Sequence, residues 1–363
     1  MIKLLSLFSG IGAFEKALRN IGEPFKIVNY CENDRYASKA YTLIHSVDES
    51  INLGDITRLE TDNIHDEIDM ITYGFPCQDI SNAGKQKGFT DEQGNLTRSG
   101  LFFEALRIIE DVQPKIAIAE NVKALVSKKF TAEFKIVLQS LNEAGYENYW
   151  AVLNARDYGI PQNRERVFII SIRKDVDHGF IFPEKFEREL MLKDMLEQQV
   201  DDKYYINDRS IRLYFPTGYD PEIITHGNKA FIDADEIVVI NATKRGCIEA
   251  REGDYVNLQF PASNTRRARV IKQCSGTLQT NDGNGVVLRE DFGLTIRKFT
   301  PKEDMRLMGF DDHDCDVLRE NEFSDSQIYK LAGNSIVVDV LEEIFVELLN
   351  QYSNVFPMES AVS

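Results

Sequence analysis

Three sequence motifs contain side chains that could together perform covalent chemistry on a bound ligand. Cys77 stands in Gly-Phe-Pro-Cys-Gln after an apolar run, and Glu120 opens Glu-Asn-Val after a later one. Arg164 and Arg166 lie in a third motif, Gln-Asn-Arg-Glu-Arg. A free thiol has a pKa of about 8.5, so nearby arginines and a helix N-terminus are needed to form the thiolate at neutral pH. A carboxyl buried near that thiol would have a raised pKa and could donate a proton.

Each of these residues also has an ordinary structural interpretation. A lone cysteine is most often a small buried apolar side chain. We interpret four of the five in this way: Cys31, Cys247, Cys274 and Cys315. Glu120 could simply stabilise a helix start through the helix dipole, and the arginines could lie at an exposed strand end. Alternation along a strand would place Gln162, Arg164 and Arg166 on one face. Cys77 differs from the other cysteines because a strand end and a rigid proline frame it.

A second group of residues fits a nucleotide-like cofactor. The run from Phe8 to Gly12 follows a strand pattern and opens a helix, so its glycines would let the backbone approach a ligand. Glu32, at the end of the next strand, could accept both hydrogen bonds of a ribose diol, and Asp55 could hold an adenine amino group. Glu15 replaces the third glycine of the G-x-G-x-x-G pattern. NAD, FAD and S-adenosylmethionine therefore stay open, as does a glycine turn that serves packing alone.

These motifs require a sheet that brings several strand ends to one edge. The first half of the chain alternates short apolar strands with helical patterns, which predicts an α/β fold with a doubly wound, mostly parallel, Rossmann-like sheet. Open sheets of this kind bind ligands beyond the strand ends. After about residue 198 the alternation stops, and short β-like runs appear between Gly, Asn and Asp clusters. We predict a catalytic and cofactor-binding domain at 1–198 plus 326–363, and a smaller loop-rich β domain at 199–325.

The composition is that of a globular protein. The chain has 363 residues, 43% hydrophobic and 28% charged, and no apolar run approaches the roughly 18 residues of a membrane span. Its five cysteines contain no C-x-x-C pair, which argues against zinc sites and disulfides and favours a cytoplasmic location. The net charge of −17 disfavours nucleic acid as a partner. However, residues 240–273 hold seven basic against three acidic side chains, whereas 303–325 hold nine acidic against two basic. A basic face on an acidic body and a solvated basic hairpin both remain open.

Six motifs together resemble, in order and spacing, those of the cytosine-5 DNA methyltransferases. The first four are the ones already described, around Gly10, Cys77, Glu120 and Arg164. The other two are Arg297-x-x-Thr-x-x-Glu-x-x-Arg-Leu-Met-Gly309 and Gly333-Asn-Ser. The resemblance spans nearly the whole chain, and six motifs in order exclude coincidence. The chain looks like the compact bacterial or phage type of this family.

The resemblance implies methyl transfer from S-adenosylmethionine to C5 of a flipped-out cytosine in a specific duplex DNA sequence. Cys77 would add to C6 of the base, because C5 is a poor nucleophile until C6 carries a covalent adduct. Glu120 would engage N3 and the exocyclic amine. Arg164 and Arg166 would hold the pyrimidine. Loss of the C5 proton would then expel Cys77.

The resemblance also implies a cofactor site and a DNA interface. S-adenosylmethionine would contact eleven residues: Phe8, Gly10, Ile11, Gly12, Glu32, Asp55, Ile56, Pro76, Leu101, Asn334 and Ser335. Residues 199–325 would recognise the target, and five residues would contact DNA: Ser81, Lys85, Arg266, Arg267 and Arg269. We expect double-stranded DNA as the partner, a monomer, no metal and no membrane association. A cognate restriction endonuclease that acts separately and an orphan enzyme without one both stay open.

Three other functions compete with this interpretation. A relative could methylate cytosine in RNA, although the bacterial-type loop signals of 199–325 argue against it. A catalytically silent DNA-binding protein could retain the fold, but intact Cys77, Glu120, Arg164 and Arg166 argue against silence. A nicotinamide oxidoreductase could use the same glycine loop, yet it would leave Pro76, Cys77 and Asn334 unexplained.

Overall fold

The chain folds into two compact units in this computed structural model, which describes residues 1–76, 89, 98–187, 189–241, 244–260, 270–353 and 355–356. The larger unit consists of Met1–Asn154, Glu165–Lys185 and Ser335–Ser363. The smaller unit consists of Ala155–Arg164 and Phe186–Asn334. The smaller unit is thus more extensive than the predicted second domain, since it also takes in 155–164, 186–198 and 326–334.

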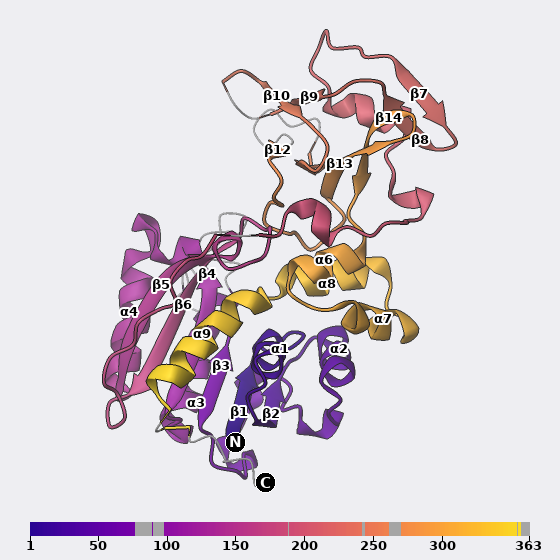
Figure 1. The fold of residues 1–363 in the computed structure, drawn as a ribbon. Helices are drawn as coiled ribbons and strands as arrows, with labels where there is room; N and C mark the ends of the chain where they lie inside the picture. Colours follow the sequence, from indigo (N-terminus) through magenta and orange to yellow (C-terminus); the bar gives the residue numbers. More distant parts are fainter. Residues whose placement is uncertain are drawn as a thin grey trace. The chain divides into compact units, whose positions relative to one another are not determined.

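A six-stranded sheet forms the centre of the larger unit, with strand order β2-β1-β3-β4-β6-β5 (Figure 1). Four of its strands run parallel: β1 (Ile2–Leu7), β2 (Phe25–Cys31), β3 (Met70–Tyr73) and β4 (Ile116–Val122). The strand β6 (Glu165–Arg173) is antiparallel to both β4 and β5 (Tyr146–Asn154). The predicted α/β class with a mostly parallel sheet is confirmed.

Helices cover both faces of this sheet. Leu5 and Leu7 of β1 belong to the core that also contains residues of α3 (Phe102–Val112) and α4 (Thr131–Glu143). Ser6 points to the opposite face, toward Glu15 of α1 (Ala13–Asn20), as alternation along a strand requires. The helices α2 (Arg35–His45) and α9 (Val338–Gln351) complete the set, and α9 lies beside α1 (Figure 1).

The smaller unit is built on antiparallel strands. Its six-stranded sheet has the order β12-β11-β13-β14-β8-β7. The strands are β7 (Ile223–His226), β8 (Lys229–Ile232), β11 (Tyr255–Asn257), β12 (Val270–Ile271), β13 (Asn284–Glu290) and β14 (Gly293–Lys298). A separate pair is formed by β9 (Ile237–Ile240) and β10 (Cys247–Ala250). Among its described residues, four α-helices accompany them: α5 (Asp208–Ile211), α6 (Pro301–Leu307), α7 (Asp312–Glu320) and α8 (Asp325–Asn334). The prediction of a second, smaller β unit is confirmed.

The motif from Arg297 to Gly309 holds β14 and α6 together. Arg297 and Glu303 are both fully buried, and two hydrogen bonds of 2.6 and 2.7 Å join them. Thr300 caps α6, because its hydroxyl accepts from the Glu303 N–H and the Glu303 carboxylate accepts from the Thr300 N–H. Removal of either side chain would leave the other buried charge without its partner. None of the helices among the described residues is long and apolar enough to cross a membrane.

Candidate active site and cofactor site

The chain turns sharply between β1 and α1, at residues 8–12, which we call the glycine loop. Phe8, Gly10 and Gly12 have positive φ angles of 52°, 56° and 76°. A β-carbon on Gly12 would lie 2.1 Å from Nε2 of His45, so a side chain at this position would collide with the histidine ring. A β-carbon on Gly10 would meet no atom of the described residues within 4 Å. The loop is therefore tightly packed at Gly12 and open at Gly10, which suits a close approach by a ligand.

Glu32 follows β2 and is fixed against the glycine loop. Its Oε2 accepts a hydrogen bond from the Gly10 N–H at 2.9 Å, and its Oε1 accepts one from the Asp34 N–H at 2.7 Å. Burial raises the pKa of the Glu32 carboxyl, and these two donors partly oppose that effect. A carboxylate has about four lone-pair sites, so both oxygens keep acceptor capacity. The loop and Glu32 together fit a ligand that carries a pair of hydroxyl groups, as a ribose does.

The other predicted cofactor residues occupy varied positions. Asp55 caps the 3-10 helix Ile56–Arg58, and its Oδ1 accepts from the Thr57 N–H at 3.0 Å, which lowers the pKa of Asp55. Ile56 is buried. Phe8 and Leu101 are half-buried against the core that contains α3, and Pro76 is also half-buried. Asn334 is the exposed last residue of α8 in the smaller unit, whereas Ser335 is buried and starts the final segment of the larger one.

Glu120 and Arg166 form an ion pair at the edge where β1, β3 and β4 end. Arg166 Nε lies 2.9 Å from Glu120 Oε1, and the two side chains are only 17% and 12% exposed. The register explains the contact: Glu120 faces Phe168 and Val122 faces Arg166, so Glu120 and Arg166 are diagonal neighbours on one face. Glu120 Oε2 lies close to Gly74, because a β-carbon built on that glycine would be 3.6 Å from this oxygen. The arrangement presents a fixed carboxylate beside the chain that leads from β3 to Pro76.

Asn121 is a residue whose role the sequence did not reveal. It is 2% exposed, and its side-chain amide donates to the Phe75 carbonyl at 3.1 Å. This bond ties the segment just after β3 to the end of β4. The only sequence signal for it was its place between Glu120 and Val122, since an asparagine next to a strand end has many ordinary roles.

Arg164 belongs to the smaller unit and precedes the strand that carries Arg166. The strand β6 begins at Glu165, because the preceding backbone pairs instead with Ser275. The prediction that one strand face carries Gln162, Arg164 and Arg166 is therefore wrong. Arg164 is buried, and its guanidinium donates to the carbonyls of Leu278 and Gly333, at 3.4 and 3.1 Å.

Gln162 and Gly333 have structural roles around the same loop. The Gln162 side chain donates to the Leu307 carbonyl at 2.7 Å and accepts from the Leu278 N–H at 3.2 Å. A β-carbon on Gly333 would lie 2.4 Å from the Gln279 carbonyl oxygen. A glycine is required where α8 passes so close to another backbone. Arg164, Gln162 and Gly333 thus fix the loop 277–280 within the smaller unit.

Several predicted site residues lie outside the residues that the structure describes. These are the proposed nucleophile Cys77 and all five predicted DNA contacts: Ser81, Lys85, Arg266, Arg267 and Arg269. Across the described ranges, no group of three or more His, Cys, Asp or Glu side chains is placed to hold a metal ion.

The described basic side chains of 240–273 are largely engaged with acids. Arg251 pairs with Glu236 at 2.8 Å, and Lys272 pairs with the buried carboxylate of Asp254 at 2.8 Å. Arg245 lies 3.8 Å from Glu249. Most of the positive charge in the described part of 240–273 is therefore next to a carboxylate.

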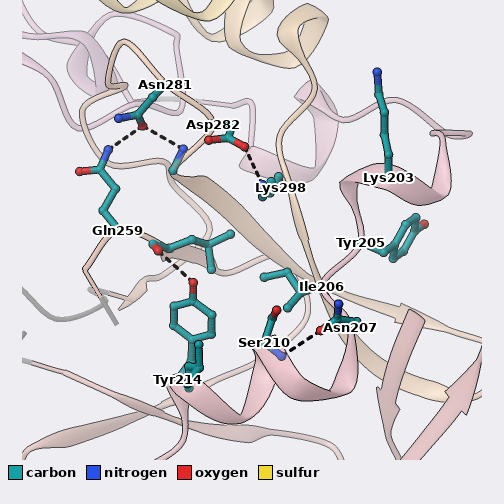
Figure 2. A pocket seen from close by; sticks show the side chains of 13 residues that line it. Lys203, Tyr205, Ile206, Asn207, Ser210, Tyr214, Gln259, Asn281, Asp282 and Lys298 are labelled. Carbon is teal, nitrogen blue, oxygen red and sulfur yellow. Dashed lines mark hydrogen bonds and ion pairs between the residues drawn. The ribbon is translucent and has the colours of Figure 1, made fainter. Parts of the chain in front are cut away.

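A polar pocket lies in the smaller unit, between α5 and the turns at 258–259 and 281–283 (Figure 2). Lys298 pairs with Asp282 at 2.5 Å, and the Gln259 amide donates to Asn281 Oδ1 at 2.7 Å. The Tyr214 hydroxyl donates to the Leu258 carbonyl at 2.9 Å.

Comparison with known proteins gives one consistent result. Residues 2–350 match the model of a family described as C-5 cytosine-specific DNA methylase. The orphan methyltransferase M.SPRI of Bacillus phage SPR is 31% identical, with 97% of this chain and 98% of the relative covered. The type II methyltransferase M.HhaI of Haemophilus parahaemolyticus is 30% identical, with 94% and 93% covered.

Solved structures agree in fold. The Entamoeba histolytica methyltransferase EhMeth has a TM-score of 0.66 at 15% identity, with 97% of this chain and 98% of that chain covered. The S. pombe Dnmt2 methyltransferase has a TM-score of 0.63 at 19% identity, with 97% and 99% covered. At these identities the likeness concerns the fold alone.

Proposed function

This chain belongs to the C-5 cytosine-specific DNA methylase family and is a DNA (cytosine-5-)-methyltransferase, and we propose that it uses S-adenosylmethionine to methylate a flipped-out cytosine in one specific duplex sequence. The observation that carries this proposal is the Glu120–Arg166 ion pair, fixed at the sheet edge where β1 enters the glycine loop. Parallel strands bring these ends together, so a carboxylate for the base and a cradle for the methyl donor share one edge of one unit.

The larger unit supplies the proposed cofactor site. When bound, S-adenosylmethionine supplies an electrophilic methyl group. Glu32 accepts hydrogen bonds from the ribose hydroxyls with the lone pairs that its two backbone donors leave, and Asp55 accepts from the adenine amino group. The glycine loop lets the ligand approach the backbone. Three further residues of the larger unit form the wall around it in this proposal: Pro76, Leu101 and Ser335.

Chemistry at the base starts with Cys77. Its thiolate forms a bond to C6 of the cytosine, and the electron pair of the C5–C6 double bond becomes available at C5. Glu120, in its protonated form, donates its proton to N3 and accepts a hydrogen bond from the exocyclic amine. N3 then takes up electron density from the ring, which favours this addition. C5 then forms a bond to the methyl group as the bond from that methyl to the donor sulfur breaks, which leaves a neutral thioether. A base removes the C5 proton, and N3 returns its proton to Glu120. The electrons of the C5–H bond restore the double bond, and Cys77 leaves as thiolate.

The two arginines position these groups. Arg166 occupies Glu120 Oε1 and fixes the carboxylate that meets the base. Arg164 holds the Leu278 and Gly333 carbonyls, so in this proposal it positions the loop 277–280 of the smaller unit. We assign target recognition to residues 199–325, with phosphate or base contacts from the arginines at 266, 267 and 269, and further DNA contacts from Ser81 and Lys85.

Expression in a host free of DNA methylation tests this function. Bisulfite sequencing should find protected cytosines in one short recurring sequence, and cells that express Cys77→Ala should show none. A soluble protein that binds S-adenosylmethionine but protects no cytosine would contradict DNA as the substrate. Label transfer to tRNA would then point to RNA, and no transfer to either nucleic acid would point to a silent relative.

A further inference from the structure

A layer of buried polar side chains supports the glycine loop, and the proposed mechanism does not use it. Glu15 of α1 and Tyr41 and His45 of α2 are all buried. The Tyr41 hydroxyl donates to Glu15 Oε1 at 2.8 Å. His45 Nε2 lies 3.0 Å from the Ile11 carbonyl oxygen, and His45 Nδ1 lies 3.2 Å from Nη2 of Arg19. His45 thus joins α2 to the glycine loop directly.

The neighbours of His45 decide which ring nitrogen carries the proton. A guanidinium can only donate, so Nδ1 accepts from Arg19 and the proton resides on Nε2. Burial lowers the pKa of His45 to about 3, and the charges of Arg19 and Lys16 act in the same direction. The ring is therefore neutral at physiological pH, and its Nε2–H donates to the Ile11 carbonyl.

This hydrogen bond fixes one peptide plane of the glycine loop. The Ile11 carbonyl and the Gly12 N–H belong to the same peptide group, and the Gly12 N–H donates to the Ser9 carbonyl at 2.8 Å. The Ser9 carbonyl and the Gly10 N–H belong to a second peptide group, whose N–H donates to Glu32. Between these two lies the peptide group of Gly10 and Ile11. Its carbonyl and its N–H have no hydrogen-bond partner among the described residues.

We propose that His45 is a positioning residue of the cofactor site: by holding the Ile11–Gly12 peptide plane, it keeps the neighbouring Gly10–Ile11 peptide group available to S-adenosylmethionine. The same ring excludes every side chain from position 12, because a β-carbon there would lie 2.1 Å from its Nε2. The inference rests on the proposed cofactor site, and it adds a residue that no motif of the sequence marks.

Calorimetric titration of the DNA-free protein with S-adenosylmethionine tests this role. His45→Leu should bind about tenfold more weakly, because a buried carbonyl loses its donor. His45→Gln, whose amide can replace Nε2–H, should restore most of the affinity. Tyr146→Phe is the matched control: it deletes a buried bond of 2.8 Å to the Pro114 carbonyl in the same unit and should leave the affinity unchanged. In turnover, His45→Leu should raise KM for S-adenosylmethionine, with kcat and KM for DNA little changed.

The outcomes separate this inference from the proposed function. If the wild-type chain does not bind S-adenosylmethionine, the cofactor site itself is wrong. If the wild type binds and folded His45→Leu binds equally well, only the role of His45 is wrong. A second measurement needs no variant: nitrogen-15 NMR of labelled histidine should find His45 neutral with the proton on Nε2 from pH 5 to 8. A proton on Nδ1 would overturn the inference.

Discussion

Arg166 reaches diagonally across two antiparallel strands to place its Nε 2.9 Å from Oε1 of Glu120. The contact is largely shielded from water, so the carboxylate is oriented before any substrate arrives. Arg166→Met should lower the single-turnover rate by about 100-fold, the usual size of an effect on preorganised electrostatics. The pair Lys123–Glu165, at 2.7 Å but 54% and 43% exposed, provides the control. Lys123→Met should change the rate by less than about twofold.

Cys77→Ala should abolish methyl transfer while leaving S-adenosylmethionine binding nearly intact, because in the proposed mechanism the thiol acts on the base and not on the methyl donor. Calorimetry measures the binding, and trapping with 5-fluorocytosine DNA measures the covalent step. The wild type should form a stable adduct and the variant none. A variant that loses its affinity for the cofactor would instead assign Cys77 a structural role.

Cofactor affinity should fall in acid as Glu32 takes up a proton. Burial raises the pKa of this carboxyl, so the loss should begin at a higher pH than an exposed glutamate would show. Glu32→Gln should weaken binding by about tenfold at pH 8, since hydrogen bonds to a charged group contribute more than neutral ones. The variant should also lose the acid dependence. A variant that keeps the wild-type pH profile would assign that profile to another group.

Asp304 should make the smaller unit more stable in acid than at neutral pH. It is fully buried in α6, both of its oxygens are without a hydrogen-bond partner in the described structure, and burial raises its pKa well above the ordinary value. Between the unfolded and the folded pKa, only the folded chain holds this proton. The free energy of unfolding then falls by about 1.4 kcal/mol for each pH unit of increase in that interval.

Asp304→Asn should remove this dependence. The melting temperature of the variant, measured relative to that of the wild type, should therefore rise as the pH increases from 5 to 8. Asp312→Asn on the neighbouring α7 is the control, because the stability contributed by Asp312 should depend on pH in the opposite direction. Arg306 hydrogen-bonds Asp312 at 2.6 and 2.7 Å and lowers its pKa. That stabilisation is present above the unfolded pKa and is lost as the pH falls through the folded pKa, so Asp312→Asn should be destabilising at pH 7 and much less so at pH 3.

DNA binding should depend on the arginines at 266, 267 and 269. Arg267→Ala should weaken binding and reduce the slope of log affinity against log salt by about 1, the effect of one lost phosphate contact. Arg251 is the matched control, because its guanidinium is already held by Glu236. Arg251→Ala should change the slope far less. Equal effects of the two variants would show that the paired arginine also reaches DNA.

The sheet and its strand ends were predictable because their signals are local. Apolar runs that end in glycine or an acid predicted that the glycine loop follows β1, that Glu32 follows β2 and that Glu120 lies near the end of β4. The rest depends on contacts between residues far apart in the chain. No local pattern shows that Gln162 forms a β-bridge with Ser275 and not part of β6, or that His45 fills the space beside Gly12. The ion pairs of Arg251 and Lys272 were hidden in the same way, since their partners lie 15 and 18 residues away.

Those ion pairs also bear on how the enzyme finds its site. Sliding along DNA requires a surface that exchanges many condensed counterions for lysines and arginines. Arg245, Arg251 and Lys272 are already beside carboxylates, and the chain as a whole carries −17. Residence on unrelated DNA should therefore be brief. The enzyme should sample the genome mostly by repeated dissociation and return through solution. Successive methylations of one DNA molecule should therefore be largely independent events.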